Sequence, residues 1–119
     1  MSKKKIIAIQ ADSLNSINIK TDTTFLLALE AQKRGNKIYW YQTKDLNFIK
    51  GKVYANVEDI RFYENRSAFY KILKKRRFDL SKANYLLIRQ NPPFNMDYIT
   101  STLFLESISK KVKIINNPI

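Results

Sequence analysis

Residues 5–42 read KIIAIQADSLNSINIKTDTTFLLALEAQKRGNKIYWYQ, in which two short apolar runs flank a polar loop and an amphipathic stretch. The runs at 5–10 and 37–42 predict buried strands, because they are short, continuous and rich in β-branched or aromatic residues. Residues 23–34 carry apolar side chains three and four positions apart, which is the spacing of one helix face. Gly35 then supplies the left-handed residue that commonly ends a helix. The segment therefore predicts a β-α-β unit with two parallel strands.

Beyond this unit, the same patterns predict five further elements, which are a hairpin over 45–57, a helix over 67–77, a strand over 85–89, a helix over 97–110 and a strand over 112–116. The first of these helices rests on Phe69, Ile72 and Leu73, which share one helical face. Residues 58–66 have no clear pattern. Because strands alternate with helices, we predict an α/β fold: a Rossmann-like parallel sheet with helices on both faces and an inserted β-hairpin.

The length and the missing residue types limit the possible chemistry. With 119 residues, the chain has the size of a single domain. It contains no Cys and no His, which excludes disulfides, thiolate nucleophiles, and the commonest general base and metal ligand. The first apolar run, Ile6 to Ile9, is too short for a signal-peptide core or a membrane span. We therefore expect a cytoplasmic protein without a membrane partner.

The chain is strongly basic, with 22 Lys and Arg against 10 Asp and Glu and a net charge of +12. One interpretation is nucleic-acid binding through the cationic runs at 3–5 and 74–77. The other is background composition, since the 16 Lys, 15 Ile and 11 Asn all have A/T-rich codons. Only 6 of the cations are Arg, the residue that reads bases through paired hydrogen bonds. We expect no nucleic-acid partner. The alternative is a small basic α/β module that binds nucleic acid or another partner without catalysis.

Motifs for cofactors and for catalysis are missing from the sequence. The only glycines, Gly35 and Gly51, do not follow the first strand, so neither a dinucleotide-binding loop nor a P-loop is present. No two carboxylates have the spacing of an acid–base pair. We therefore expect no catalytic residue, no bound cofactor and no metal site in this chain.

Two polar loops mark the candidate binding site, one over 11–20 after the first strand and one over 89–95 after a later strand. In parallel sheets, ligands bind at the carboxyl ends of the strands. Arg89 would emerge at that edge, and an Arg can hold a carboxylate through two parallel hydrogen bonds. Two prolines fix the backbone beyond it. Alternatively, Arg89 pairs with a carboxylate of this chain and the prolines only turn the backbone.

Three blocks of the sequence are distinctive: SINIKTDTTF at 16–25, LEAQKRG at 29–35 and LIRQNPPFNMDYIT at 87–100. Together they resemble the N-terminal domain of the prokaryotic glutathione synthetases. The resemblance runs in unbroken order through nearly the whole chain to 115–118, whereas the middle, 58–80, matches poorly. The third block is the most specific of the three.

The resemblance implies an ATP-grasp ligase. In this family, ATP and Mg²⁺ activate the cysteinyl carboxylate of γ-glutamylcysteine as an acyl phosphate, which glycine attacks to give glutathione. It further implies that residues 1–119 are a single N-terminal domain of pre-ATP-grasp type, which helps to form the peptide-substrate side of the cleft and takes part in a homo-oligomer. The family's ATP and Mg²⁺ sites lie in later domains. We therefore expect this chain to lack the ATP-grasp domain and to be inactive alone.

The resemblance also implies a set of substrate-binding residues from the two loops, namely Arg89, Asp12, Ser16, Asn18 and Asn91. Arg89 would clamp a carboxylate or a phosphate, the residues of the first loop would add polar contacts, and Asn91 would support the second loop. The family usually reads Arg-x-Asp-Pro-Pro-Phe-Asp, whereas this chain has Asn91 and Asn95 in place of the two carboxylates. Asn keeps the capacity for hydrogen bonding but loses the charge.

Overall fold

The computed structural model of the protein describes residues 5–17, 23–65, 67–89, 108 and 112–116. Its strands are β1 (Ile6–Gln10), β2 (Lys37–Tyr41), β3 (Leu46–Ile49), β4 (Lys52–Phe62), β5 (Tyr70–Asp79), β6 (Tyr85–Ile88) and β7 (Lys113–Asn116). The helical elements of the described residues are α1 (Thr23–Lys33) and three short 3-10 turns, η1 (Leu14–Ser16), η2 (Thr43–Asp45) and η3 (Leu80–Lys82). The β-α-β unit is confirmed, and Gly35 follows the helix with a φ of 88°.

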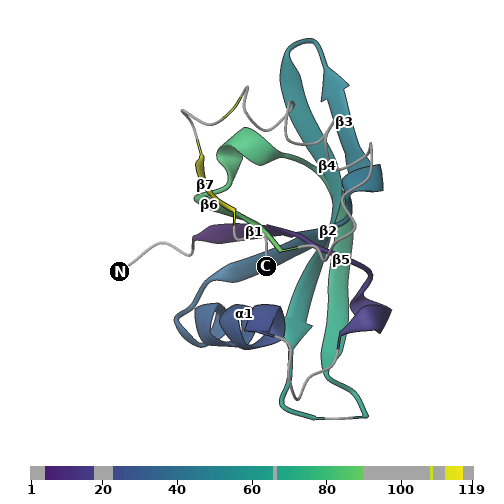
Figure 1. Ribbon diagram of the computed structural model, residues 1–119, viewed down its shortest axis with the longest axis vertical. Helices are drawn as coiled ribbons and strands as arrows, with labels where there is room; N and C mark the ends of the chain where they lie inside the picture. Colours follow the sequence, from purple (N-terminus) through teal and green to yellow (C-terminus); the bar gives the residue numbers. More distant parts are fainter. Residues whose placement is uncertain (1–4, 18–22, 66, 90–107, 109–111, 117–119) are drawn as a thin grey trace.

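The seven strands of the described residues form one sheet, ordered β3-β4-β2-β1-β6-β7. Strands β3 and β2 pair with different halves of one edge of β4, and β5 pairs along its other edge. Strands β2, β1, β6 and β7 are parallel, as the Rossmann-like α/β fold requires. Strand β4 is antiparallel to β2, β3 and β5. The sheet therefore has a parallel part and an antiparallel wing, which consists of β3, β4 and β5 and curls away from it (Figure 1).

The predicted hairpin over 45–57 is confirmed as β3 and β4, and it is longer than predicted. Two residues, Lys50 and Gly51, join the strands with φ angles of 51° and 78°. Positive φ at both central residues is typical of the tight turn whose twist matches that of the flanking strands. Strand β4 then continues to Phe62, so most of the segment 58–66, which had no clear pattern, is its second half.

The predicted helix over 67–77 is wrong, because residues 70–77 belong to strand β5 (Tyr70–Asp79). Residues Ile72 and Lys74 face consecutive residues of β4, so Leu73 between them is an extra residue, a β-bulge. The bulge shifts the alternation of the strand by one position. With Phe69 and Ile72, the extra residue Leu73 imitates the spacing of a helical face, although Leu73 is 54% exposed and belongs to no buried face.

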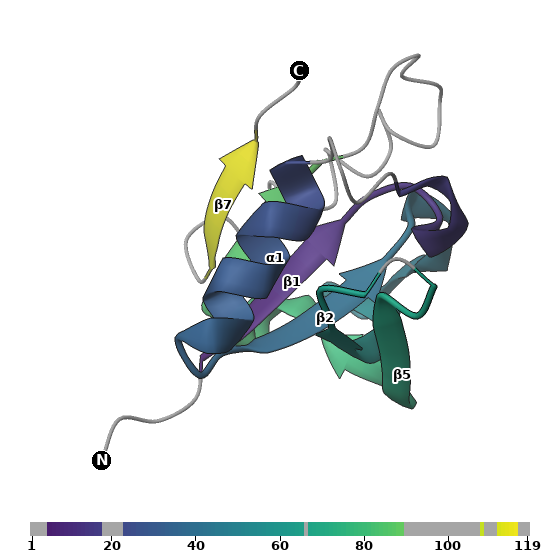
Figure 2. The ribbon, with the colours of Figure 1, turned by 90° about the horizontal axis from the view of Figure 1, so that it is seen from below.

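Helix α1 covers one face of the sheet and lies over β1 (Figure 2). Phe25 of α1 packs edge-on against the rings of Phe62 and Phe69, with centroids 5.5 and 6.0 Å apart. The side-chain amide of Gln32 donates to the carbonyl oxygen of Phe62 at 2.9 Å and accepts from its N–H at 2.7 Å. These contacts fix the helix to the end of β4.

A second apolar cluster covers the opposite face. Its centre is the edge-on pair of Tyr39 and Phe78, with ring centroids 4.9 Å apart, and Leu80 and Leu86 are fully buried beside it. Ile108 is buried in the same cluster. The predicted helix over 97–110 otherwise lies outside the described residues, so the helical layer expected on this face stays a prediction.

Phe78 and Leu73 provide a direct test of the strand over 70–79. Phe78 is 5% exposed, and Phe78→Ala is expected to lower the free energy of unfolding by ~3–5 kcal/mol, since it leaves a cavity in the core. Leu73→Ala is the matched control, for which we expect a change of about 0.5 kcal/mol or less. Urea unfolding followed by the fluorescence of Trp40 measures both. A large loss for Leu73→Ala would place this residue on a buried helical face and contradict the bulge.

Asp79 is the N-cap of η3, and its carboxylate accepts from the N–H and the hydroxyl of Ser81 at 3.0 and 2.7 Å. Partial burial acts to raise the pKa of Asp79, but the hydrogen bonds from Ser81 and the charges of Lys52 and Lys82 outweigh it and lower that pKa below its ordinary value. Because the pKa is lower in the folded state, the ionised carboxylate stabilises the fold at neutral pH. This stabilisation is lost as the pH falls through about 4 and below.

Two variants of Asp79 separate its charge from its role as a cap. Asp79→Ala is expected to lower the free energy of unfolding at pH 7 by ~1 kcal/mol, because the cap is lost. Asp79→Asn keeps a capping oxygen but does not titrate, so it should lose less stability than the wild type as the pH falls from about 5 to 2. Urea unfolding at a series of pH values gives both results. Parallel pH profiles for the wild type and Asp79→Asn would contradict the role of the charge.

Candidate functional site

The two predicted loops leave the same edge of the sheet. Strands β1 and β6 are parallel neighbours, with Gln10 opposite Ile88 at their carboxyl ends. Arg89, the first residue of the second loop, donates its backbone N–H to the carbonyl oxygen of Gln10 at 2.8 Å. The edge is therefore the place where an α/β sheet of this type binds its ligand.

Arg89 is half-buried, and its guanidinium group contacts the first turn of α1. Its Nε donates to the hydroxyl of Thr24 at 3.2 Å, and its Nη2 donates to the hydroxyl of Thr23. Thr23 and Thr24 are the first two residues of the helix. The end of β6 and the start of α1, which lie far apart in the sequence, are thus joined at the ligand-binding edge.

The positive charge of Arg89 has only neutral oxygens as partners among the described residues. The ion pairs of this part of the chain involve other cations: Lys33 with Glu64, Arg34 with Glu30, and Lys75 with Glu58. The N-terminal end of a helix carries a partial positive charge and offers a guanidinium group no compensation. The described geometry therefore favours Arg89 as a receptor for an anion over its pairing with a carboxylate of the described residues.

The other predicted site residues have mixed outcomes. Asp12 lies two residues beyond β1, and its backbone carbonyl oxygen accepts a hydrogen bond of 3.1 Å from the indole N–H of Trp40. Ser16 is the last residue of η1. Asn18 and Asn91 lie outside the described residues. The structure thus brings Arg89 and the loop of Asp12 to one edge and leaves the remaining contacts as predictions.

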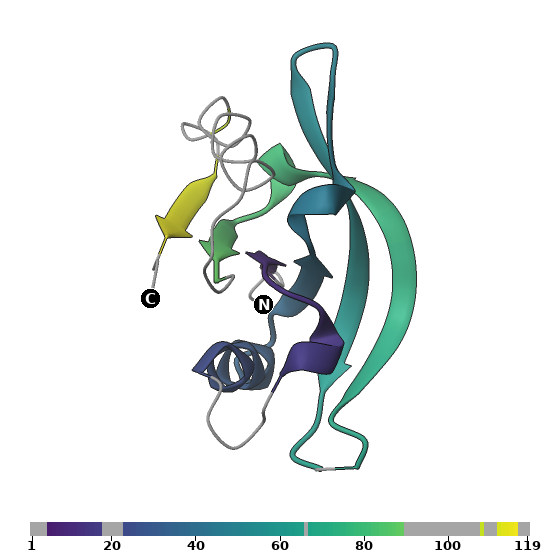
Figure 3. The same cartoon turned by 45° about the vertical axis from the view of Figure 1, so that its right-hand side comes forward.

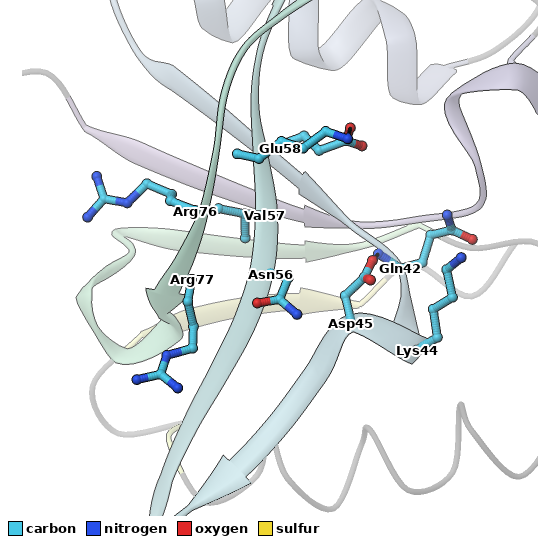
Figure 4. Close-up of a pocket in the computed structure, with 9 residues that line it drawn as sticks. Gln42, Lys44, Asp45, Asn56, Val57, Glu58, Arg76 and Arg77 are labelled. Carbon is cyan, nitrogen blue, oxygen red and sulfur yellow. Dashed lines mark hydrogen bonds and ion pairs between the residues drawn. The ribbon is translucent and has the colours of Figure 1, made fainter.

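A cavity of about 160 Å³ lies beside η1 and is lined by that turn, by Trp40 and Gln42, and by β5. It adjoins a second cavity of about 470 Å³ on the antiparallel wing, with which it shares Gln42, Asp45 and Glu58. Figure 4 shows the residues of the larger cavity, where Arg76 and Arg77 point away from Gln42, Lys44 and Asp45. Its cations therefore do not converge on a single point, as a built anion site would require.

The basic run 74–77 lies on strand β5, at the outer margin of the sheet (Figure 3). Successive residues of a strand point to opposite faces, so the four cations are divided between two faces. Arg76 lies over the ring of Phe78, with 5.9 Å to the centroid, and Arg77 lies over the ring of Tyr54 at 4.9 Å. These rings are used within the sheet, and the arrangement does not favour a nucleic-acid surface with aromatic side chains free to stack on bases.

Two features of the described residues bear on acid–base and metal chemistry, namely the phenol of Tyr41 and the distribution of the carboxylates. The hydroxyl of Tyr41 is buried and has no hydrogen-bond partner among the described residues. Burial raises the pKa of Tyr41 far above its ordinary value, so the phenol stays protonated and is not a general base. No three Asp or Glu side chains of the described residues are grouped closely enough to hold a metal ion. No described helix is long and apolar enough to cross a membrane.

Sequence reasoning missed Thr23 and Thr24 as part of the site. Both residues were predicted as part of the helix over 23–34, and ligand contacts were expected only in the loops. A signal was nonetheless present. In a β-α-β unit, the helix begins at the edge where the first strand ends, so the first residues of the helix face the same edge as Arg89. Two hydroxyl side chains at that position were candidates for contact with the site.

Comparison with known proteins identifies the family. The model of the prokaryotic glutathione synthetase, N-terminal domain, matches residues 6–119. The glutathione synthetase of Agrobacterium fabrum is 41% identical over 118 residues, which are 99% of this chain and 37% of the relative. Those of Mesorhizobium japonicum and Buchnera aphidicola subsp. Schizaphis graminum are both 40% identical, over 94% and 99% of this chain and 36% and 38% of their own lengths. The chain therefore spans little more than a third of these relatives, and it belongs to the family of prokaryotic glutathione synthetase N-terminal domains.

Proposed function

We propose that these residues are the N-terminal domain of a glutathione synthetase, a ligase that uses ATP to join γ-glutamylcysteine to glycine through an acyl phosphate. In this proposal the domain helps to form the side of the cleft that holds the peptide substrate. The observation that carries it is the guanidinium group of Arg89, held at the carboxyl edge of β6 with only hydroxyl partners among the described residues. Family membership supplies the reaction.

Arg89 acts in this proposal by binding and orienting the substrate. γ-Glutamylcysteine carries two carboxylates, and a guanidinium group can hold one of them with two parallel hydrogen bonds. Such binding fixes the direction of the dipeptide as well as its position. Asp12, Ser16 and Asn18 would contact polar groups of the dipeptide from the first loop, and Asn91 would support the second loop.

The described residues offer no recognisable site for the ATP and Mg²⁺ that the reaction requires. The described residues have no cluster of carboxylates that could hold Mg²⁺. The two glycines serve the end of α1 and the β3–β4 turn, so no glycine-rich loop is available to surround a phosphate. We propose that both are bound by parts of the enzyme outside these 119 residues and that the chain alone does not catalyse the reaction.

We further propose that β3 and its turn form a contact between copies in a homo-oligomer. Phe48 and Ile49 of β3 are 47% and 39% exposed, so an apolar surface lies at the tip of the antiparallel wing. Strand β3 pairs only with β4 among the described residues and therefore lies at an edge of the described sheet. Apolar side chains next to an available strand edge are suited to a contact with a second copy.

Arg89→Ala in the full-length enzyme is expected to raise the KM for γ-glutamylcysteine about 10- to 100-fold, which is what the loss of hydrogen bonds to a charged group predicts. The KM for glycine should stay near the wild-type value. Arg89→Lys is the matched control, because it keeps the charge without the planar pair of donors, and its KM should lie between the two. Steady-state kinetics with each substrate varied in turn measure these values. An unchanged KM for the dipeptide would remove Arg89 from the site, and a wild type without ligase activity would refute the proposed function.

Phe48→Glu is expected to weaken the oligomer, because it places a charge in an apolar contact. Sedimentation equilibrium of the full-length protein should then show a lower mass than for the wild type at the same concentration. Leu26→Glu is the control, since Leu26 is 55% exposed on α1, which lies away from β3 (Figure 1). A wild type that is monomeric at high concentration, or an equal effect of the two variants, would contradict the contact.

A further inference from the structure

We propose that Thr23 and Thr24 are positioning residues that determine which side of the Arg89 guanidinium group meets the substrate. The two hydroxyls hold the side formed by Nε and Nη2, and they thereby direct the side formed by Nη1 and Nη2 toward a substrate carboxylate. This inference rests on the proposed function and adds to it the orientation of the carboxylate and the residues that impose it.

The geometry of the guanidinium group carries the inference. Its atoms are coplanar, and it offers two sides with paired donors: Nε with Nη2, and Nη1 with Nη2. Thr24 accepts from Nε at 3.2 Å and Thr23 accepts from Nη2, so the first side is occupied. Among the described residues, no group accepts from Nη1. Because the group is planar and rigid, holding one side fixes the direction of the other.

Thr24 is the buried member of the positioning pair, whereas Thr23 beside it is exposed. Thr24 is 7% exposed, at the start of a helix whose Gln32 is hydrogen-bonded twice to the backbone of Phe62. The backbone of Arg89 is fixed in turn by its hydrogen bond to Gln10. Both partners of each side-chain contact therefore belong to the packed sheet and its helix, so the guanidinium group is ordered before the substrate arrives. Preorganisation of this kind reduces the entropy cost of binding.

The neutrality of the partners determines the class of ligand. A carboxylate at the position of Thr23 or Thr24 would pair with the guanidinium charge and compete with the substrate. Hydroxyl oxygens accept hydrogen bonds without neutralising the charge, which stays available for an anion. The remaining pair of parallel donors matches the two oxygens of a planar carboxylate, and we assign it to a carboxylate of the dipeptide.

Variants that remove only the hydroxyls test this in the full-length enzyme. Thr24→Val and Thr23→Val keep the shape of the side chain, and each should raise the KM for γ-glutamylcysteine about 2- to 12-fold, the range for one hydrogen bond. The kcat and the KM values for glycine and ATP should stay unchanged. Thr24→Ser and Thr23→Ser keep the hydroxyl and should restore the wild-type KM. A rise in the KM for ATP alone would assign the donors to a phosphate and overturn the proposal.

The combination with Arg89→Ala separates a positioning role from a merely structural one. If the hydroxyls act through Arg89, adding Thr24→Val to Arg89→Ala should raise the KM no further. An equal rise in both backgrounds would show that Thr24 acts independently of Arg89. An unchanged KM for both valine variants, with a raised KM for Arg89→Ala, would overturn this inference and leave the proposed function intact.

A spectroscopic measurement tests the contact without relying on activity. In ¹⁵N-labelled protein, the Nε–H of Arg89 should exchange slowly with water, and Arg89→Lys identifies its signal. The signal should be lost in Thr24→Val and kept in Thr24→Ser. Its absence from the wild type, or its survival in Thr24→Val, would overturn the inference even if the enzyme had no ligase activity. Lack of ligase activity with the expected signals would refute only the proposed function.

Discussion

The antiparallel pairing of β4 with β2 is the constraint on which the rest of the structure depends. It continues a parallel sheet into the antiparallel wing and brings Phe62, at the end of β4, against helix α1. Gln32 and Phe25 bind the helix at that point. The placement of α1 sets the positions of Thr23 and Thr24, and these in turn set the guanidinium group of Arg89. The site at one edge is thus connected to strand pairing in the wing through a continuous series of packed groups.

The parts of the fold that follow from local sequence were the parts that could be predicted. Helix α1 and its flanking strands follow from apolar spacing within a few residues, and Gly35 and Gly51 take the positive φ angles that their places require. Strand β5 could not be identified in this way. Its bulge at Leu73 disrupts the alternation of a strand, and its conformation depends on β4, whose paired residues lie 8 to 25 positions away in the sequence. Nonlocal pairing overrides local propensity in such a segment.

The position of the candidate site could likewise be predicted only in part. Arg89 could be predicted, because an Arg at the end of a buried strand lies at the ligand-binding edge of a parallel sheet. Its partners could not, since Thr24 and Arg89 are 65 residues apart and only the packed fold brings them together. In the proposed function, the described residues would supply a binding group and its support, and the reacting chemistry would lie elsewhere in the protein.

Strand β5 is the margin of the sheet in the described residues, because it pairs only with β4. A strand of 10 residues with an available edge is a template on which another extended chain can grow. Here that edge carries Lys or Arg at positions 71 and 74–77, and the bulge interrupts its regular register. If two such edges met, like charges would lie opposite each other, and the bulges would prevent a regular alignment of the backbone N–H and C=O groups. The basic run therefore disfavours edge-to-edge pairing between two copies at β5, an effect that requires no ligand.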